Sequence, residues 1–301
     1  MKRAAIVLAA LLGASRGEAA VDIAALWDFG DAAHSEAAFR AALDAADGDD
    51  ALSLQTQIAR TYSLRSRFAD AHALLDRIAP AIEHAGPEPK VRALLERGRT
   101  FRSAKQVERA APLFHAAVEL ATAAKLESLA VDAMHMVALV EPTPDGQLAW
   151  NRRALGYAKQ ANDPAAQRWE ASLANNIGMT LHETGRYAQA DEAFRMQLAA
   201  RERLGKPEGI RIAHWMIAWN LRAMKRHDEA LAILMRLERE TAALGAPDGF
   251  VFEEIGENLL ARGDAEAAKP WFAKAHAALS QDTSLDRPDA ARLARLLALA
   301  R

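Results

Sequence analysis

Few side chains in this sequence have the types and spacing that catalysis requires. The nine histidines occur without the paired spacing of metal ligands, and cysteine is absent. No phosphate-binding loop, zinc-protease motif or nucleophile elbow occurs. Glu253 and Glu257 are four residues apart on one expected helix and could act as an acid–base pair, although a solvated groove edge is the simpler interpretation. We therefore expect a protein that is not an enzyme and uses no cofactor or metal.

Two tryptophans favour binding more strongly than any residue favours catalysis. Trp215 and Trp219 lie one helical turn apart, and Arg222 follows them. Tryptophan and arginine offer large contact areas and are enriched at binding hot spots. The competing interpretation is that residues 210–224 are apolar on every side, so that both tryptophans belong to the core. The sequence leaves both interpretations open.

The segment that contains the two tryptophans belongs to a sequence pattern that repeats about every forty residues. A small residue is followed by an apolar one three positions later, an alanine twelve later and a bulky apolar one sixteen later. The small position is held by Ala59, Gly98, Gly178, Ala218 and Gly256, with a weaker unit at His135. The bulky position is held by Leu75, Phe114, Phe194, Leu234 and Phe272, with Asn151 as the exception.

The pattern is typical of paired antiparallel helices that stack on their neighbours. Where two helix axes approach within about 8–10 Å, one partner must be small and the adjacent bulky side chains fill the remaining space. Short polar breaks such as residues 184–187 supply the turns, and residues 141–146 replace that turn in the third unit. No segment alternates with the period of a strand, so we predict an all-α protein.

The repeats resemble the tetratricopeptide repeat family, most closely at residues 176–198 and 254–277. The resemblance spans residues 51–280 and implies a right-handed α-solenoid of about six helical hairpins. The segments 56–62 and 252–255 also look like those of bacterial repeat proteins whose function is uncharacterised. The spacing exceeds the usual thirty-four residues, which indicates longer helices or loops.

The resemblance also implies that the first helix of each repeat lines a concave groove. Residues on the exposed face of these helices are the expected partner-binding set: Arg60, Arg99, Arg102, Asn175, Met179, His182, Trp215, Trp219, Arg222, Glu253 and Glu257. Chaperone-binding members of the family hold a terminal carboxylate with lysine, asparagine and arginine. Asn176 matches the asparagine position, but Ile212 and Met216 are apolar where that family has cations. The sequence does not support such a clamp, and Asn176 is expected to bridge neighbouring repeats.

Charge argues against a nucleic-acid partner. The formal net charge is −2 at pH 7, and no basic stripe with interleaved aromatic residues is present. Arginines do cluster at residues 60–67 and 97–102, but we interpret these clusters as solvated helix faces. Half of the residues (51%) are hydrophobic and only 6% are aromatic, as expected of tightly packed helices.

The two ends of the chain carry different expectations. Residues 1–20 combine a basic start, an apolar stretch and small residues, which predicts a signal peptide too short to remain as a membrane anchor. Residues 21–50 resemble an incomplete repeat that caps the N-terminal end. Residues 281–301 are expected to form a C-terminal capping helix whose core residues are Leu293, Leu296, Leu297 and Leu299.

The sequence therefore predicts a non-catalytic scaffold, monomeric or weakly dimeric, that is exported to the periplasm and binds a peptide or partner helix in its groove. One alternative is a small-ligand binder or enzyme that uses His182, Glu253 and Glu257. Another is a cytosolic regulatory protein of the same repeat family.

Overall fold

The computed structural model describes residues 21–281 and 290–301, and in these ranges every regular element is a helix. Paired helices form six successive hairpins: α2 (Gly48–Leu64) with α3 (Phe68–His84), α4 (Pro87–Ser103) with α5 (Val107–Ala123), α6 (Glu127–Ala138) with α7 (Pro144–Gln160), α9 (Glu170–Glu183) with α10 (Tyr187–Leu204), α11 (Pro207–Ala223) with α12 (His227–Ala243), and α13 (Gly249–Ala261) with α14 (Ala265–Leu279). The remaining elements are η1 (Ile23–Leu26), α1 (Ala32–Leu43), the short α8 (Pro164–Gln167) and α15 (Ala290–Leu299). The all-α prediction is confirmed.

A single left-handed residue closes most of the hairpins. Ser66, Lys105, Gly185, Lys225 and Gly263 occupy this position, with φ angles between 60° and 92°. The third hairpin differs because residues 139–143 replace the tight turn, and Thr143 then caps α7 by accepting from the backbone N–H of Gly146 (3.1 Å). The irregular turn was predicted at residues 141–146; it lies at residues 139–143, and residues 144–146 already belong to the first turn of α7.

Contacts between small and bulky residues hold each hairpin together. A Cβ atom added to Gly178 would lie 2.5 Å from the ring of Phe194, and one added to Gly256 would lie 2.8 Å from the ring of Phe272. Both rings are almost completely buried. These are the pairs that the repeat alignment predicts, so the register of the repeats is confirmed.

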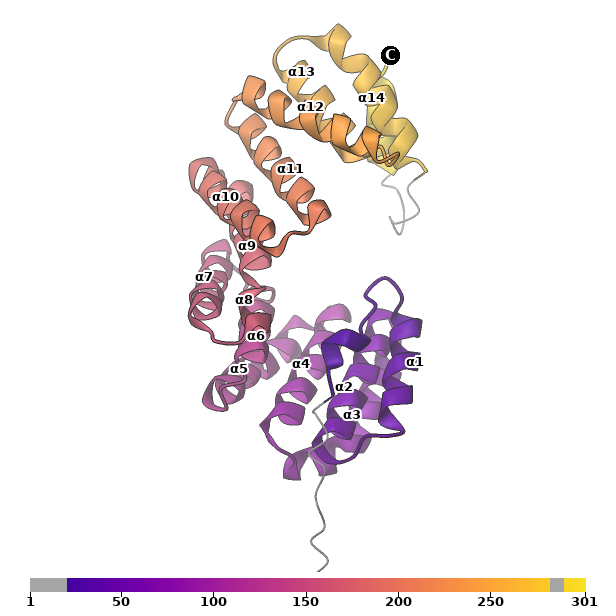
Figure 1. The fold of residues 1–301 in the computed structure, drawn as a ribbon, viewed down its shortest axis with the longest axis vertical. Coiled ribbons are helices and arrows are strands. Elements are labelled where there is room, and N and C mark those ends of the chain that lie inside the picture. Colours follow the sequence, from indigo (N-terminus) through magenta and orange to yellow (C-terminus); the bar gives the residue numbers. More distant parts are fainter. Residues whose placement is uncertain (1–20, 282–289) are drawn as a thin grey trace, which may run out of the picture.

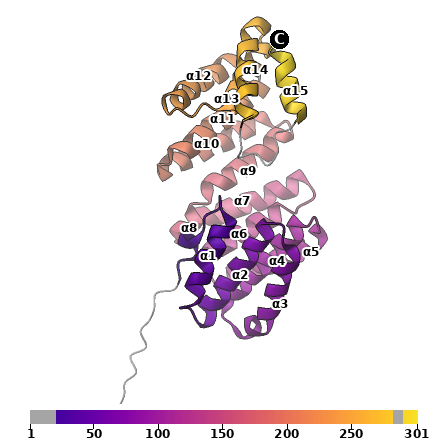
Figure 2. The same ribbon diagram turned by 90° about the vertical axis from the view of Figure 1, so that its right-hand side faces the viewer.

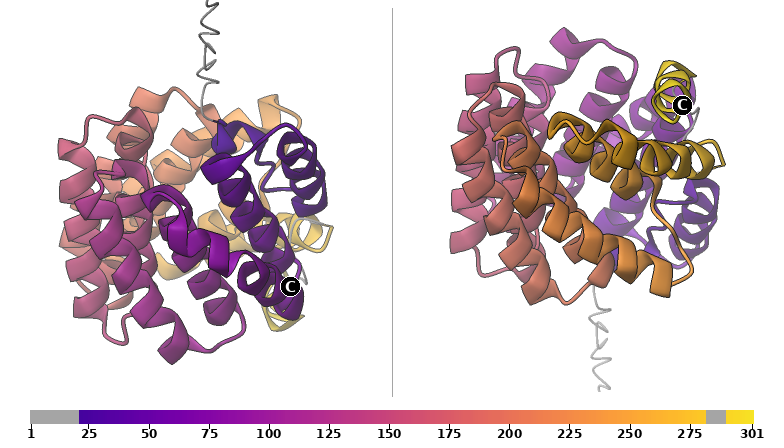
Figure 3. Two further views of the ribbon diagram at one scale, coloured as in Figure 1. Left: turned by 90° about the horizontal axis from the view of Figure 1, so that it is seen from below. Right: turned by 90° about the horizontal axis from the view of Figure 1, so that it is seen from above.

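The hairpins stack into a curved solenoid (Figure 1). The arc runs from α1–α4 at the lower right, through α5–α10 at the left, to α11–α14 at the top. Figure 2 shows the successive layers from the side, and Figure 3 shows the helices arranged around the long axis. First helices of neighbouring repeats contact each other directly, as α2 contacts α4 and α4 contacts α6, whereas no pair of second helices in the described part of the chain packs as closely. The first helices therefore form the inner face of the curve.

Helices cover both ends of the stack. At the N-terminal end, Phe39 of α1 is fully buried against residues of α2 and α3. At the C-terminal end, Leu296 of α15 is fully buried, and Leu293 and Leu299 pack around it. Leu297 was expected in the same cap but is 43% exposed, because it points about 100° away from Leu296 around the helix. That prediction is wrong.

No helix in residues 21–281 or 290–301 combines the length and the apolar character needed to cross a bilayer. The expected signal peptide, residues 1–20, lies outside the described residues.

Candidate functional site

Polar contacts connect the inner-face helices of neighbouring repeats along most of the solenoid. Each contact joins side chains, or a side chain and a backbone oxygen, on two successive first helices. The pairs are Gln57 with Glu96, Arg99 with Asp132, His135 with Asn176, His182 with Asn220, Trp215 with Phe250, and Arg222 with Glu254. Many polar groups of the inner face are thus already bonded within the protein, which limits how many remain for a ligand.

The N-terminal part of this face holds a buried ion network. Arg99 donates to both oxygens of Asp132 (2.5 and 2.6 Å) and to Glu96 (2.6 Å). The side chains of Glu96 and Arg99 are only 2% and 13% exposed. Burial alone would lower the pKa of Arg99, but the two carboxylates raise it overall. Burial would raise the pKa of Asp132, but Arg99 lowers it below its ordinary value. This arginine is therefore a structural link rather than a free binding group.

Arg60 lies beside the same network but is less completely paired. Its guanidinium is 3.8 Å from Glu96 and stacks near the rings of Trp27 and Phe29 (5.1 and 5.4 Å). Burial and the nearby charge of Arg99 hold the pKa of Arg60 below its ordinary value. Arg102 is exposed on the same face and has no ion pair with a described residue.

Three rings form an aromatic platform on the middle of the inner face. The imidazole of His182 stacks on Trp219 at a centroid distance of 3.4 Å, and Trp219 is nearly parallel to Trp215 at 6.1 Å. All three side chains are half-buried. The tryptophans pack on the edge of the core and also reach the surface. The core interpretation is therefore correct in part, and the binding role stays a prediction.

A hydrogen-bond chain orients the histidine of the aromatic platform. Asn220 donates its Nδ2 hydrogen to the backbone oxygen of Tyr187 (3.0 Å), so its Oδ1 is left as an acceptor. His182 must then donate from Nδ1 to that oxygen (2.9 Å), which leaves Nε2 as an acceptor in the neutral ring. Burial lowers the pKa of His182, with Asn220 opposing and Arg222 reinforcing this effect, so the ring is neutral at physiological pH.

The C-terminal part of the inner face is a row of glutamates on α13, each paired with an arginine. Glu254 pairs with Arg222, while Glu253 and Glu257 pair with Arg292 and Arg295 of α15. Burial raises the pKa of Glu254 although Arg222 opposes the shift. His182 of α9 bonds Asn220 of α11, whereas Glu253 and Glu257 of α13 both pair with arginines of α15. No hydrogen bond joins His182 to Glu253 or Glu257 within the described residues, and the geometry required by the enzyme alternative is absent there.

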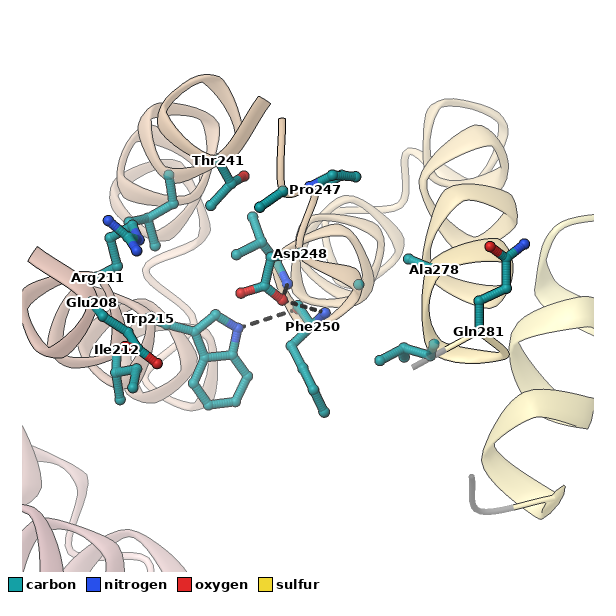
Figure 4. Close-up of a pocket in the computed structure, with 15 residues that line it drawn as sticks. Glu208, Arg211, Ile212, Trp215, Thr241, Pro247, Asp248, Phe250, Ala278 and Gln281 are labelled. Atoms are coloured by element: carbon teal, nitrogen blue, oxygen red, sulfur yellow. Dashed lines mark hydrogen bonds between the residues drawn. The ribbon is translucent and has the colours of Figure 1, made fainter. Parts of the chain in front are cut away.

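A cavity of about 870 Å³ opens beside the aromatic platform (Figure 4). Trp215 forms one wall and donates its indole N–H to the backbone oxygen of Phe250 (3.2 Å). Asp248 caps α13 by accepting from the backbone N–H groups of Phe250 and Val251 (2.8 and 3.3 Å). Ile212, which also lines the cavity, is 50% exposed. The cavity is large enough for peptide side chains and is mixed in character.

The predicted binding set is thus distributed over several environments. Arg99 is buried, Arg60 and Arg222 are partly buried and paired, and Glu253 and Glu257 are paired with α15. Asn175 and Met179 are half-buried on α9. The structure stacks His182, Trp215 and Trp219 on one another, whereas Arg60 and Arg99 share Glu96 and the two glutamates share α15 as their partner helix. Asn176 contacts the ring of His135 in the preceding repeat (3.3 Å), which agrees with a bridging role.

Of the residues that line the cavity, the predicted binding set contains only Trp215, and it missed Asp248 and Phe250 among others. Asp248 and Phe250 lie at the start of α13, outside the most regular part of the repeat. The signal was present as an aspartate immediately before Gly249, since aspartate is a preferred N-cap, but nothing indicated that it would face Trp215. Among the described residues, no group of three or more His, Asp or Glu side chains is arranged to hold a metal ion.

The fold and this inner face define a helical-repeat protein. The family model described as "Tetratricopeptide repeat" matches residues 169–239, which include α9, α10 and α11. Residues 169–239 therefore match this family, and the stacked hairpins in the other described residues have the same architecture. Repeats of this kind generally serve as non-catalytic scaffolds.

Solved structures share the architecture at low sequence identity. The apo form of RapI has a TM-score of 0.72 and 12% identity, over 88% of this chain and 75% of RapI. The apo form of the quorum sensor NprR from B. thuringiensis has a TM-score of 0.59 and 12% identity, with the same coverage. A signal transduction ATPase with a tetratricopeptide repeat sensor, from Pyrococcus horikoshii, has a TM-score of 0.66 and 11% identity. That alignment covers 82% of this chain, which spans only 39% of the ATPase. No curated protein matches the chain by sequence.

Proposed function

We propose that this protein is a non-catalytic interaction scaffold that binds a peptide or a partner helix on its inner face. The observation that carries the proposal is the half-buried aromatic platform of His182, Trp219 and Trp215, which leads into the adjacent cavity. Aromatic rings bind through apolar area and ring faces, which remain usable when neighbouring polar groups are already bonded. The platform is therefore the part of the inner face best suited to a partner.

A structural neighbour supports the peptide component of the proposal. NprR has also been solved in complex with its cognate peptide NprX, and that structure has a TM-score of 0.52 and 13% identity to this chain. The likeness concerns the fold alone. It supports the idea that a solenoid of this shape can hold a peptide, while the residues that would contact it must be argued from this chain.

Replacing Trp219 tests the proposal most simply. Peptides selected from a displayed random library against the full chain should bind the Trp219→Ala variant roughly thirtyfold or more weakly, the loss of about 2 kcal/mol expected of a tryptophan hot spot. Calorimetric titration of each selected peptide measures this change. The circular dichroism of the variant should stay close to that of the original protein, because Trp219 is only half-buried.

Trp150 provides a matched control. It is also a half-buried tryptophan next to a histidine, at 5.3 Å from His115, but it lies on the second helix of its hairpin, α7. Trp150→Ala should leave the affinity of the selected peptides unchanged. Equal losses in the two variants, or a loss only in Trp150→Ala, would exclude the aromatic platform as the binding surface.

We further propose that the scaffold acts after export and as a monomer or weak dimer. The basis for export is the signal-like composition of residues 1–20. Purification of the untagged protein from its native host followed by N-terminal sequencing should give a mature chain that starts near Val21. A chain that retains residues 1–20 would instead favour the cytosolic regulatory alternative.

A further inference from the structure

The cavity beside the aromatic platform carries carboxylates that have no cationic partner among the described residues. Asp248 uses Oδ1 to cap α13, and neither Asp248 nor Glu208 forms an ion pair in those parts of the chain. The other three carboxylates on the inner side of α13, at Glu253, Glu254 and Glu257, are all paired with arginines. Asp248 therefore differs from its neighbours on the same helix.

Two aromatic side chains lie beside these carboxylates. Figure 4 shows the Asp248 carboxylate beside the Trp215 indole and the Phe250 side chain, with Glu208 on the other side of the indole. Arginines and lysines are attracted to the faces of tryptophan and phenylalanine, and a nearby carboxylate adds an ion pair. The wall of the cavity thus combines the two features that recognise a cationic side chain.

The protein already uses this chemistry at the adjoining position. Arg292 of α15 places its guanidinium 4.7 Å from the Phe250 ring and donates to both oxygens of Glu253 (3.2 and 2.8 Å from Nε). The same phenylalanine also lines the cavity. Phe250 therefore contacts Arg292 of the chain itself and also lines the cavity, where Asp248 and Glu208 form no ion pair with an arginine of the described residues.

One cation also lines the cavity and must be counted. Arg211 is three residues from Glu208 on α11, and although no ion pair joins them, its positive charge cancels that of Glu208 in the net charge of the cavity. In Figure 4 its guanidinium lies on the far side of the indole from Phe250. With Glu208 and Arg211 cancelled, the negative charge of Asp248 is left, so the residues that line the cavity carry a net charge of one negative unit.

We infer that this cavity receives the side chain of an arginine or lysine of a bound peptide, with apolar neighbours of that residue on Ile212 and the aromatic platform. The inference rests on the proposed function, since it names the chemistry of the peptide that the inner face selects. The opposite possibility is that the cavity binds an acidic side chain, which would pair with Arg211. The experiment below distinguishes a basic from an acidic peptide.

Three short capped peptides serve as probes. They are acetyl-Leu-Arg-Leu-amide, the same peptide with citrulline in place of arginine, and the same peptide with glutamate. Citrulline keeps the shape of arginine and removes its charge. Binding is followed by nuclear magnetic resonance through the indole N–H signal of Trp215, which is assigned by its absence from a Trp215→Phe variant.

The arginine peptide should shift the Trp215 signal at millimolar concentration, and the citrulline peptide should bind roughly tenfold more weakly. Asp248→Asn should reduce the affinity for the arginine peptide to that of the citrulline peptide. Asparagine caps helices about as well as aspartate, so this variant should retain α13. Asp31→Asn is the matched control, because Asp31 caps α1 with the same two-bond geometry outside the cavity.

Equal affinity for the arginine and citrulline peptides would overturn the inference, as would stronger binding of the glutamate peptide, an unchanged affinity in Asp248→Asn, or no shift with the arginine peptide. Failure here is distinguishable from failure of the proposed function. If library-selected peptides still depend on Trp219 but not on the charge of Asp248, the scaffold function stands and only the peptide chemistry is wrong.

Discussion

Replacing Gly178 with leucine should lower the free energy of unfolding by roughly 3 kcal/mol or more, an effect at the upper end of those seen for overpacked cores. The reason is the contact between α9 and α10, where even a Cβ atom would lie 2.5 to 2.9 Å from three atoms of the Phe194 ring. The ring is fully buried and cannot move aside without opening the core. Urea denaturation followed by circular dichroism measures the change.

Gly156→Ala is the matched control for the glycine substitution. Gly156 also lies within a helix, α7, but a Cβ atom there would meet nothing within 4 Å. This variant should gain roughly 0.5–1 kcal/mol, because alanine is the better helix former. Combining Gly178→Ala with Phe194→Leu should recover part of the stability lost in Gly178→Ala alone. Unchanged melting of Gly178→Leu would show that the repeat register is wrong.

Replacing Arg99 with methionine should lower the free energy of unfolding by about 3–5 kcal/mol at pH 7, because the substitution leaves Glu96 and Asp132 buried without their main cation. Arg97→Met on the same helix is the control. Arg97 bonds an exposed carboxylate, Asp76, so its loss should change the free energy by less than about 1 kcal/mol. Parallel urea titrations compare the two variants.

The pH dependence of the Arg99 effect separates electrostatics from packing. In the original protein the pKa of Asp132 is lower in the folded state than in the unfolded state. The ionised carboxylate therefore stabilises the fold at pH values above its unfolded-state pKa. This stabilisation is lost as the pH falls through the folded-state pKa. Without Arg99, burial should raise the pKa of Asp132 instead. The difference between the original protein and Arg99→Met should therefore shrink as the pH falls from 7 to about 4. A difference independent of pH would assign the effect to lost packing.

The sequence predicted the repeated part of this fold well. Small and bulky positions such as Gly178 and Phe194 are set by local close packing, which recurs in each unit and is visible without knowledge of the rest of the structure. The irregular turn before α7 was visible for the same reason, since it interrupts a regular pattern. Leu297 was misplaced because the sequence of a short final helix does not show which side its neighbours occupy.

The candidate site was less predictable because its character depends on contacts between repeats. Arg99 is a long cationic residue on a first helix, as expected of a groove residue. Only its bond to Asp132, 33 residues later, shows that it links two neighbouring repeats instead. His182 and Trp219 were both selected as groove residues, but their stacking depends on how α9 and α11 lie against each other, which the sequence of either helix does not show. The cavity involves the non-repeating segment at Ala246–Asp248, for which a repeat alignment has no equivalent position.

Hydrogen–deuterium exchange of the full chain, with and without a library-selected peptide, tests the central claim most directly. We expect slower exchange in α9, α11 and α13, the inner helices that carry the aromatic platform and the start of the cavity. Protection confined to the outer helices α10, α12 and α14, with the inner helices unchanged, would contradict it.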